Sequence, residues 1–511
     1  MPGVTLSDVC AEHRRQYPDK VAVIDGSVRL TWPELDGRVD GAARLLAQRG
    51  VRRGDRVLWL AQTSFRFLEL MIACSRLGAM ICAANWRQSA EEFAFVIDDF
   101  DPKVIVWQQE EIGHRVEAAR SLAGTSATWI QHDTEAADAY ENLLATAGDN
   151  PVARASEPDD AVFVIYTAAI SGRPNGSMLS NRNLIAMATV TGPVTGASND
   201  SVFINSGPLF HIGNFQFDAM PVFVAGGTNV YVRRVQADEL LNIIATERVT
   251  SAFLMPPTIL EMKALNESRK LDISCLRAGA LAPVWGDALP PDTTAWSASG
   301  GGFGQTEVTG LAVLNAFGGR GIGNSGRPSP MSLVRIVDAE GTEVPNGSTG
   351  EITIKGDTVH LGYWNRPEVN AARMRNGWWH TTDCGRRESD GTIHFIGTMT
   401  RMIKSAAENI YPPEVESCLT SHPAIKEAAI IGVPDARFTQ SVKAVVTLED
   451  GATVSAEEII EHCRARIASY KKPKTVEFID ALPRSGGATD YDALDRMFGG
   501  GGYPGGINVR G

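Results

Sequence analysis

Several short segments carry the residues that can do chemistry in this chain. The first is Tyr166–Ser177, a run of small and polar residues after the apolar segment Ala161–Ile165. The pattern predicts a loop between that strand and a helix that starts near Asn181. Such a loop can turn backbone N–H groups toward a phosphate. A plain connecting loop explains the same residues, so this segment alone does not define a phosphate site.

The second and third segments pair hydroxyl and carboxylate groups with glycines and an aromatic ring. Gly301–Glu307 places Phe303 among glycines, followed by the hydroxyl of Thr306 and the carboxylate of Glu307. An aromatic ring can stack on a base, a hydroxyl can bind a phosphate, and a carboxylate can hold Mg²⁺. Further along, Asp383 follows a Trp-Trp-His-Thr-Thr run and can accept hydrogen bonds from ribose hydroxyls. A Gly-rich turn and a capping aspartate are the structural alternatives.

The fourth segment, Ser405–Glu416, has small and polar residues before a stretch that favours a helix. On its own it can be a loop that enters a helix. All of these segments need elements that bring them together, and the remaining sequence indicates which elements those are.

The N-terminal part of the chain alternates helical and strand patterns. Thr31–Arg49 has the apolar spacing of a helix, and Thr31 with Glu34 fits a capping box at its start. A strand, a buried helix and a second strand are expected at residues 57–60, 65–77 and 103–107. Because helices and strands alternate, the pattern predicts a parallel sheet covered by helices.

The C-terminal part follows different patterns. Near Gly326 the sequence changes to alternating segments, 333–337 and 350–354, which predict a small antiparallel barrel or sheet. After Gly397 a small α+β domain is expected, with helices at 413–421 and 456–468 and strands at 427–433 and 442–448. The glycine-rich end from Gly499 onward is expected to be disordered.

Size and composition limit the possible classes of protein. A chain of 511 residues is expected to form two or more domains. The net charge of −12 argues against a nucleic-acid partner. The cysteines are odd in number and dispersed, which indicates reduced thiols and a cytoplasmic protein. The longest apolar stretch, 70–84, contains Arg76 and Gly78, so we expect a buried helix and a strand there, and no membrane partner.

The order and spacing of these segments resemble the adenylate-forming superfamily of acyl-CoA synthetases, peptide-synthetase adenylation domains and luciferases. The resemblance runs from about Leu6 to about Arg496 and includes residues 208–211, 326–328, 362–364 and 482–484. It implies an α/β fold: a large N-terminal domain of two α/β sheet subdomains plus a small β-barrel, and a mobile small α+β C-terminal domain. The implied domains are 1–400 and 401–498, with a tail at 499–511 and a hinge at Thr400 and Arg401.

Members of this superfamily run two half-reactions, and the resemblance implies which residues take part. A carboxylate first attacks the α-phosphate of ATP to give an acyl-adenylate, and then the small domain rotates and the CoA thiol attacks the acyl carbon. The implied adenylate-binding residues are Gly279, Ala280, Phe303, Gly304, Thr306 and Asp383. The implied catalytic residues are Thr306, Glu307 and His211, and Glu307 is the candidate metal ligand. The implied CoA-tunnel loop consists of Ser405, Ala406, Ala407, Glu408 and Asn409. His211 lies between the nucleotide and acyl pockets in this comparison, although a buried core histidine is an equal alternative.

The sequence departs from the superfamily where the triphosphate would be held. The phosphate loop keeps Thr167, Ser171, Gly172 and Gly176 but has Asn175 in place of its lysine, and Ala168, Ala169 and Ile170 replace its glycine and hydroxyl residues. The ribose-contacting arginine falls on Thr398. The C-terminal lysine falls on Thr489, and no lysine follows Lys474. Alanines occupy the usual glycine pair at 406–407, which narrows the loop beside a pantetheine arm.

These departures lead to a specific hypothesis about function. The site is expected to bind an acyl-AMP but to make one poorly, because each missing donor can cost about 10²–10³ in rate. The chain would then transfer the acyl group of a preformed acyl-AMP to CoA, and a separate ligase would supply the adenylate. This resembles the non-adenylating acyl-CoA ligase type of platensimycin and platencin biosynthesis, which implies a bulky diterpenoid acid. The alternatives are a complete ATP-dependent synthetase and a silent acyl-adenylate or acyl-CoA binding protein. The need for Mg²⁺ and the oligomeric state stay open, and a homodimer is compatible with the sequence.

Overall fold

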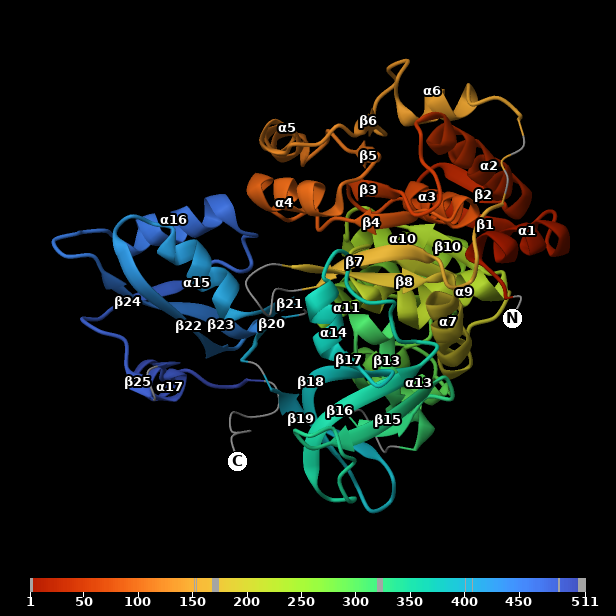
Figure 1. Cartoon of the computed structure of the whole chain (residues 1–511). Helices are drawn as coiled ribbons and strands as arrows, with labels where there is room; N and C mark the ends of the chain where they lie inside the picture. Colours follow the sequence, from red (N-terminus) through yellow and green to blue (C-terminus); the bar gives the residue numbers. More distant parts are fainter. Residues whose placement is uncertain are drawn as a thin grey trace.

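The structure is a computed structural model that describes residues 3–150, 152, 154–167, 174–318, 325–399, 401–406, 408–485 and 488–503. The predicted site residues Ser171, Gly172, Thr400 and Ala407 therefore lie outside the described residues. Two α/β layers and an antiparallel sheet form the larger part of the molecule, and a small C-terminal domain lies beside them (Figure 1).

The first α/β layer is a sheet in the order β6-β5-β3-β4-β7-β8, in which all strands but β8 run parallel. Its strands are β3 (Arg56–Leu60), β4 (Met80–Ala83), β5 (Val104–Trp107), β6 (Thr128–Gln131), β7 (Ala161–Thr167) and β8 (Asn175–Ser180). Helices α4 (Ala90–Phe100) and α5 (Gly113–Leu122) pack together on one face, and the short α6 (Tyr140–Ala145) follows β6. The parallel sheet predicted for this part of the chain is confirmed.

The second layer has the order β11-β9-β10-β1-β2, again parallel except at its edge strand β2. Its strands are β1 (Val21–Asp25), β2 (Val28–Thr31), β9 (Val202–Asn205), β10 (Thr228–Tyr231) and β11 (Ser251–Ala252). Helices α10 (Ala237–Glu247) and α11 (Pro256–Arg269) share a core with this sheet. Two further helices, α7 (Asn181–Thr195) and α9 (Met220–Ala225), pack against each other, and π-helix η1 (Phe215–Ala219) contacts both of them.

The main core lies between the two layers. Helices α1 (Leu6–Gln16), α2 (Trp32–Gln48) and α3 (Phe65–Leu77) pack there, and α3 contacts strands of both sheets. Thr31 caps α2: its side chain accepts from the backbone N–H of Glu34, and the Glu34 carboxylate completes the capping box. Helix α3 is buried on nearly every face, as a sequence that is apolar on most faces predicts.

The antiparallel sheet begins earlier in the chain than the sequence indicates. Its strands follow the order β12-β13-β14-β19-β18-β16-β15, with β17 beside β18. They are β12 (Gly302–Gln305), β13 (Gly310–Leu314), β14 (Ser325–Pro328), β15 (Ser332–Val337), β16 (Thr349–Gly356), β17 (Met374–Arg375), β18 (Trp378–Arg387) and β19 (Ile393–Thr398). The expected start near Gly326 is wrong, because Gly302–Gln305 already pairs in this sheet. The glycine-rich segment that the sequence places in the α/β region thus belongs to the antiparallel sheet.

The phosphate-loop segment also differs from its prediction. It does not join a strand to a helix: β7 and β8 form an antiparallel hairpin, with Thr167 opposite Asn175. Helix α7 starts only after β8, and Ser180 caps it. The reason is that Asn175–Ser180 pairs along β7, although its mixed polar composition resembles a loop.

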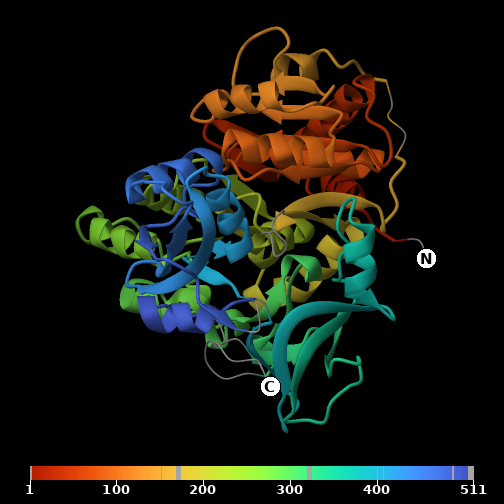
Figure 2. The ribbon, with the colours of Figure 1, turned by 60° about the vertical axis from the view of Figure 1, so that its left-hand side comes forward.

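The C-terminal domain is a small α+β unit, as predicted. Its sheet has the order β21-β20-β23-β22, with β24 on β23. The strands are β20 (Ile403–Ser405), β21 (Glu408–Ile410), β22 (Ile425–Asp435), β23 (Thr439–Leu448) and β24 (Thr475–Phe478), and β25 (Arg484–Ser485) pairs with β26 (Ala488–Thr489) separately. Helices α15 (Pro412–Thr420) and α16 (Ala456–Arg466) share a core with this sheet, and α17 (Tyr491–Phe498) packs on β22. Figure 2, turned from the first view, shows this domain in front of the larger part.

The start of the C-terminal tail is ordered by a buried tyrosine, so the expectation of disorder from Gly499 is wrong for Gly499–Tyr503. Tyr503 is only 8% exposed, and its hydroxyl donates to Asp495 Oδ1 at 2.9 Å and accepts from the Gly432 N–H at 2.8 Å. Arg401 stacks on the same ring and forms an ion pair with Asp495. An aromatic anchor inside a glycine-rich run is therefore enough to bind this part of the tail to the domain.

Two further expectations concern cysteines and membranes. All the cysteines are free thiols. Within the described ranges, no helix has both the length and the apolar character needed to cross a membrane.

Candidate active site

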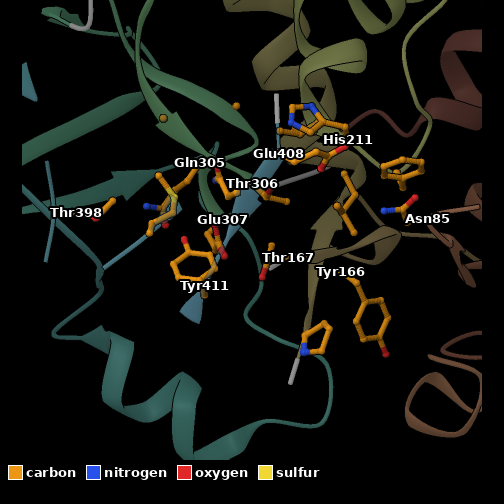
Figure 3. Close-up of a pocket in the computed structure, with 18 of the residues that line it drawn as sticks. Asn85, Tyr166, Thr167, His211, Gln305, Thr306, Glu307, Thr398, Glu408 and Tyr411 are labelled. Atoms are coloured by element: carbon orange, nitrogen blue, oxygen red, sulfur yellow. The ribbon is translucent and has the colours of Figure 1, made fainter. Parts of the chain in front are cut away.

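A cavity of about 610 Å³ lies where the C-terminal domain meets the larger part of the chain. The carboxyl ends of two parallel strands reach it, at Ala83 of β4 and Thr167 of β7, and the segment after β9 brings His211. Ligands of open α/β sheets bind at this end of the strands. Figure 3 shows His211 and Glu408 near one end of the cavity, Thr398 near the other, and Thr306 and Glu307 between them.

Ten of the predicted site residues line this one cavity, although they come from distant parts of the chain. Those that line it are Thr167, His211, Phe303, Gly304, Thr306, Glu307, Asp383, Thr398, Glu408 and Asn409. Gly279 and Ala280, predicted for adenine, do not line it. They form the short 3₁₀ helix η2 (Gly279–Leu281), and Ala280 packs so close behind Gly300 that a side chain there would meet it at 2.5 Å. They support the glycine-rich strand from behind.

Strand β12 carries the nucleotide-type residues into the cavity. A Cβ atom at Gly304 would lie 1.8 Å from the Gly310 carbonyl oxygen, so only glycine lets β12 approach β13 this closely. Phe303 stacks on Phe395, with ring centroids 5.3 Å apart. Immediately after the strand, Thr306 and Glu307 enter a 3₁₀ turn beside the cavity. The arrangement fixes a hydroxyl and a carboxylate next to an aromatic surface.

Glu307 is the predicted metal ligand, and its surroundings limit what it can hold. Its carboxylate is buried and accepts a hydrogen bond from the Tyr363 hydroxyl at 2.6 Å. In the part of the chain that the structure describes, no group of three or more His, Cys, Asp or Glu side chains is arranged to hold a metal ion. Mg²⁺ commonly binds through one or two carboxylates plus substrate phosphates. Glu307 fits that pattern only together with a phosphate of the ligand.

Asp383 lies in β18 with its carboxylate in the cavity. Gln305 Nε2 donates to Asp383 Oδ2 at 3.0 Å, and the strand pairing sets Asp383 directly opposite Thr398. Burial first, and then the nearby Glu307 charge, raise the pKa of Asp383 to about 7, while Arg373 and the Gln305 hydrogen bond oppose this. Near neutral pH this carboxyl group therefore changes charge, and only its ionised form is a pure acceptor for ribose hydroxyls.

His211 caps the one-turn helix α8 (Ile212–Asn214). Its Nδ1 atom accepts a hydrogen bond from the Gly213 N–H at 3.0 Å, so the neutral ring carries its proton on Nε2. Burial lowers the pKa of His211, which keeps the ring neutral. His211 lines the cavity, and its Nε2–H is the polar group of the ring that the Gly213 hydrogen bond leaves over.

The predicted CoA loop is the turn of the β20–β21 hairpin. Ala406 has a positive φ of 52° and so takes a conformation that favours glycine, although its side chain opposes it. Glu408 lies next to the cavity and pairs with Arg87 of the larger domain at 2.8 Å. At Ala406 the backbone thus has the conformation expected for glycine despite the substitution, and Glu408 and Asn409 line the same cavity as Thr306 and Glu307.

The residues at the positions where the family has cations do not replace those cations in the cavity. Asn175 Oδ1 accepts from Arg366 Nε at 3.0 Å, so the residue in place of the loop lysine takes part in the surrounding protein. Thr489 lies in β26, where its hydroxyl accepts from Arg484 at 3.3 Å, and it does not line the cavity. Arg401, predicted as a hinge residue, pairs with Asp492 and Asp495 inside the C-terminal domain.

A buried ion pair that joins the two domains was not found from the sequence. The Lys471 ammonium lies 2.7 Å from Glu92 of α4 and 2.5 Å from Glu414 of α15. Burial opposes its charge, but the two carboxylates raise the pKa of Lys471 above its usual value. Nearby, Ser89 Oγ donates to the Arg466 carbonyl at 2.7 Å. Nothing in the local sequence pattern indicates contacts between residues so far apart in the chain, nor that Arg373, Lys404 and Tyr470 also line the cavity.

Comparisons with known proteins agree with this fold and site. The family model of AMP-binding enzymes matches residues 10–364, and the model of their C-terminal domain matches residues 414–487. The chain therefore belongs to the AMP-binding enzyme family, the adenylate-forming superfamily, and within it to the acyl-CoA ligase branch.

Relatives and solved structures extend over nearly the whole chain. A feruloyl-CoA synthase from Amycolatopsis sp. is 34% identical over 92% of this chain and 94% of its own. An indoleacetate–CoA ligase from Aromatoleum aromaticum is 32% identical over 94% of this chain and 95% of its own. The amide bond synthetase McbA from Marinactinospora thermotolerans shares the fold, with a TM-score of 0.80 at 23% identity, over 97% of this chain and 100% of McbA.

Binding of adenosine is expected to depend on pH through Asp383. Ribose hydroxyls need the ionised carboxylate, so the affinity should be full above pH 7 and fall by about tenfold per pH unit below it. Adenosine itself does not titrate in this range. Calorimetric titration between pH 5.5 and 8.5 measures the profile. Asp383→Asn should flatten it, and a profile that is equally steep in this variant would assign the titration to another group.

The Lys471 ion pair is expected to hold the C-terminal domain in place. Glu92→Gln removes one charge but keeps a side-chain oxygen that can accept from the Ser89 N–H in the capping box of α4, and it leaves the Lys471–Glu414 pair intact. We expect a loss of about 1–2 kcal/mol in domain docking, hence about 5- to 30-fold faster hydrogen exchange in the β20–β21 hairpin. Glu91→Gln, an exposed neighbour on the same helix, is the matched control. Unchanged exchange in Glu92→Gln would show that other contacts hold the domain.

Proposed function

We propose that this protein transfers the acyl group of a preformed acyl-AMP to the thiol of CoA. The observation that carries the proposal is the set of side chains that share the cavity with Thr306 and Glu307. The hairpin residues Lys404, Glu408 and Asn409 face them, whereas Thr489 lies elsewhere. In the two-step scheme of the family, the segment at position 489 serves adenylation and the hairpin serves thioester formation. The orientation of the domain therefore favours the second half-reaction.

The charges of the cavity support the same choice. Glu307 and Asp383 line it close enough for the charge of Glu307 to raise the pKa of Asp383, and of the three basic side chains that also line it, Lys471 is already paired with Glu92 and Glu414. A triphosphate would add several negative charges to these, and like charges in a buried site repel strongly. At the three positions where the family has cations, this chain has the neutral residues Asn175, Thr398 and Thr489. An acyl-AMP brings a single phosphate with one charge, which this cavity accommodates far better.

The chemistry of the transfer needs few groups from the protein. The CoA thiol, as thiolate, attacks the carbonyl carbon of the acyl-AMP, a carbon–sulfur bond forms, and the bond to the AMP oxygen breaks. The thiol proton leaves to solvent, and AMP departs as a good leaving group. In this proposal the His211 Nε2–H donates to the carbonyl oxygen while negative charge develops on it. The thiol would enter beside the hairpin, past Asn85 and Tyr470.

A second function, a complete acyl-CoA synthetase, is favoured by the relatives. The feruloyl-CoA synthase and the indoleacetate–CoA ligase are named for thioesters of aromatic acids. If this chain keeps some adenylation, it would act on free acids of this kind with ATP and Mg²⁺. In the split reaction, a separate adenylating enzyme must supply the acyl-AMP. A bulky polycyclic acid is the other acyl class to test.

The experiment that separates these functions uses the pure protein with CoA. One set of tubes holds synthetic feruloyl-, indoleacetyl-, fatty acyl- and polycyclic acyl-adenylates, and the other holds the matching acids with ATP and Mg²⁺. We expect CoA thioester, detected by mass spectrometry, only in the first set. Thr489→Lys should leave the second set inactive, because position 175 also lacks its lysine. Thioester from acid and ATP in the natural chain would identify a complete synthetase, and none in either set would favour a binding protein.

His211 is expected to contribute as a hydrogen-bond donor. Loss of one preorganised donor to a developing oxyanion costs about 10²–10³ in rate. His211→Ala should therefore lower kcat for the acyl-AMP reaction by about 10²-fold with little change in KM, whereas His211→Gln, which keeps a donor, should recover part of it. Steady-state kinetics on the best adenylate measures both. A larger effect on KM than on kcat would limit His211 to shaping the acyl pocket.

A further inference from the structure

The cavity is lined by three basic side chains that the superfamily motifs do not point to, and their engagement differs. Lys471, Lys404 and Arg373 all line it. Lys471 is fully used between Glu92 and Glu414. Lys404 lies on the hairpin, its ammonium is 2.7 Å from Asn409 Oδ1, and burial lowers its pKa. Of these three side chains, Arg373 is the one that belongs to the larger domain, and not all of its N–H donors are used.

Arg373 is the last residue of helix α14 (Pro367–Arg373) and is anchored from one side. Its Nη1 donates to Thr382 Oγ1 at 3.1 Å and its Nη2 donates to the Thr381 carbonyl at 3.0 Å. The guanidinium carbon lies 5.2 Å from the centroid of the Trp379 ring. A guanidinium has five N–H donors. Its Nε–H is buried and has no partner within the described part of the chain.

An unpaired buried donor on an arginine is costly, because the desolvated N–H gains nothing in return. The cost is recovered when an acceptor binds there. A planar guanidinium with its outer donors already fixed is a preorganised donor to a bound acceptor, and phosphate oxygens are the acceptors that suit it best.

The backbone next to Arg373 is also held in an unusual conformation. Thr382 has a positive φ of 58°, which is unfavourable for a β-branched residue. Two contacts stabilise it: the Thr382 N–H donates to Glu351 Oε1 at 2.9 Å, and Arg373 donates to the Thr382 hydroxyl. Strained residues of this kind concentrate at binding sites. Here the two contacts hold the Arg373 guanidinium in a defined position beside the neighbouring Asp383.

We propose that Arg373 binds the phosphate of the adenylate, from helix α14, in place of the cations absent at positions 175, 398 and 489. This rests on the proposed function only in taking an AMP moiety as ligand. The phosphate would accept from the Nε–H edge of Arg373, while the ribose hydroxyls donate to Asp383 and Thr306 donates to the same phosphate. Because α14 belongs to the larger domain, this cation stays in the site whatever the position of the C-terminal domain.

Thr398 offers a way to separate a ligand contact from a structural role. Thr398 lies on β19 and is the cross-strand partner of Asp383 on β18, so the two residues are neighbours in the sheet. An arginine introduced there can reach the ligand but cannot replace the hydrogen bonds of Arg373 to Thr381 and Thr382. Recovery of binding by such a second change would therefore report on the ligand and not on the backbone.

The test is titration of the purified chain at pH 8.5 with AMP and, separately, with adenosine. The high pH keeps Asp383 ionised, because loss of Arg373, which lowers the pKa of Asp383, would otherwise also weaken ribose binding. Arg373→Met should weaken AMP by about 10- to 100-fold, as expected for a charge-assisted contact, and change adenosine by less than about threefold. Arg373→Met/Thr398→Arg should recover at least tenfold of the lost AMP affinity. Arg386→Met, an exposed arginine on the same strand β18 that pairs with Glu388, is the matched control and should bind both ligands as the natural chain does.

Two outcomes would overturn the proposal. Equal weakening of AMP and adenosine in Arg373→Met, without recovery by Thr398→Arg, would assign Arg373 to support of the strained strand. Unchanged AMP binding would remove it from the site. If Arg373→Met does not fold, as judged by its melting temperature, Arg373→Lys gives the same comparison with a smaller expected loss, since lysine keeps the charge but not the fixed donors. Because AMP binding is measured directly, these outcomes are independent of whether the chain forms a thioester.

Discussion

The shape of the cavity depends on one buried cluster of charges, in which Lys471 forms ion pairs with both Glu92 and Glu414. A charge inside protein is unfavourable unless its partners are close and well placed. Glu414 is carried by the same domain as Lys471, but Glu92 belongs to the other one. The two domains therefore meet best where Glu92 reaches the ammonium group, and in that position the β20–β21 hairpin forms one wall of the cavity.

The hairpin in turn decides which chemistry faces the nucleotide-type residues. Glu408, held by Arg87, and Asn409 are brought across from Thr306. The segment of Thr489 is kept on the β25–β26 pair. Since the chain has no lysine there, a rotation that carried Thr489 into the cavity would bring no cation with it. A single stable docking geometry is thus consistent with a protein that performs one half of a two-step reaction.

How far the sequence predicts this molecule differs from element to element. Helix α2 is predicted closely because its start is encoded locally, by Thr31 and Glu34, and α3 because its sequence is apolar on most faces. The segment at 175–180 is not, because it becomes a strand only by pairing with β7, which a local pattern does not contain. The same limit explains the early start of the antiparallel sheet at Gly302.

The candidate site shows a similar division. Motifs within a few residues, such as Thr306 with Glu307, are recognisable and do line the cavity. Gly279 and Ala280 also match a motif, but they do not line the cavity. Ala280 packs instead against Gly300, a contact that their neighbours in the sequence do not indicate. Arg373 matches no motif. Its place is set by three-dimensional contacts with Thr381 and Thr382, which become visible only when α14 is packed on β18.

The site has strained backbone conformations, but it lacks several of the charges that the family has. Thr382, which lines the cavity, and Ala406, in the β20–β21 hairpin, both adopt positive φ angles without being glycine. Each such residue costs about 1–2 kcal/mol that the fold must offset elsewhere. At positions 175, 398 and 489, by contrast, the side chains that would meet extra phosphates are neutral. A scaffold that bears strain around an adenylate site, while these three cations are missing, supports the proposal that the ligand arrives as the adenylate.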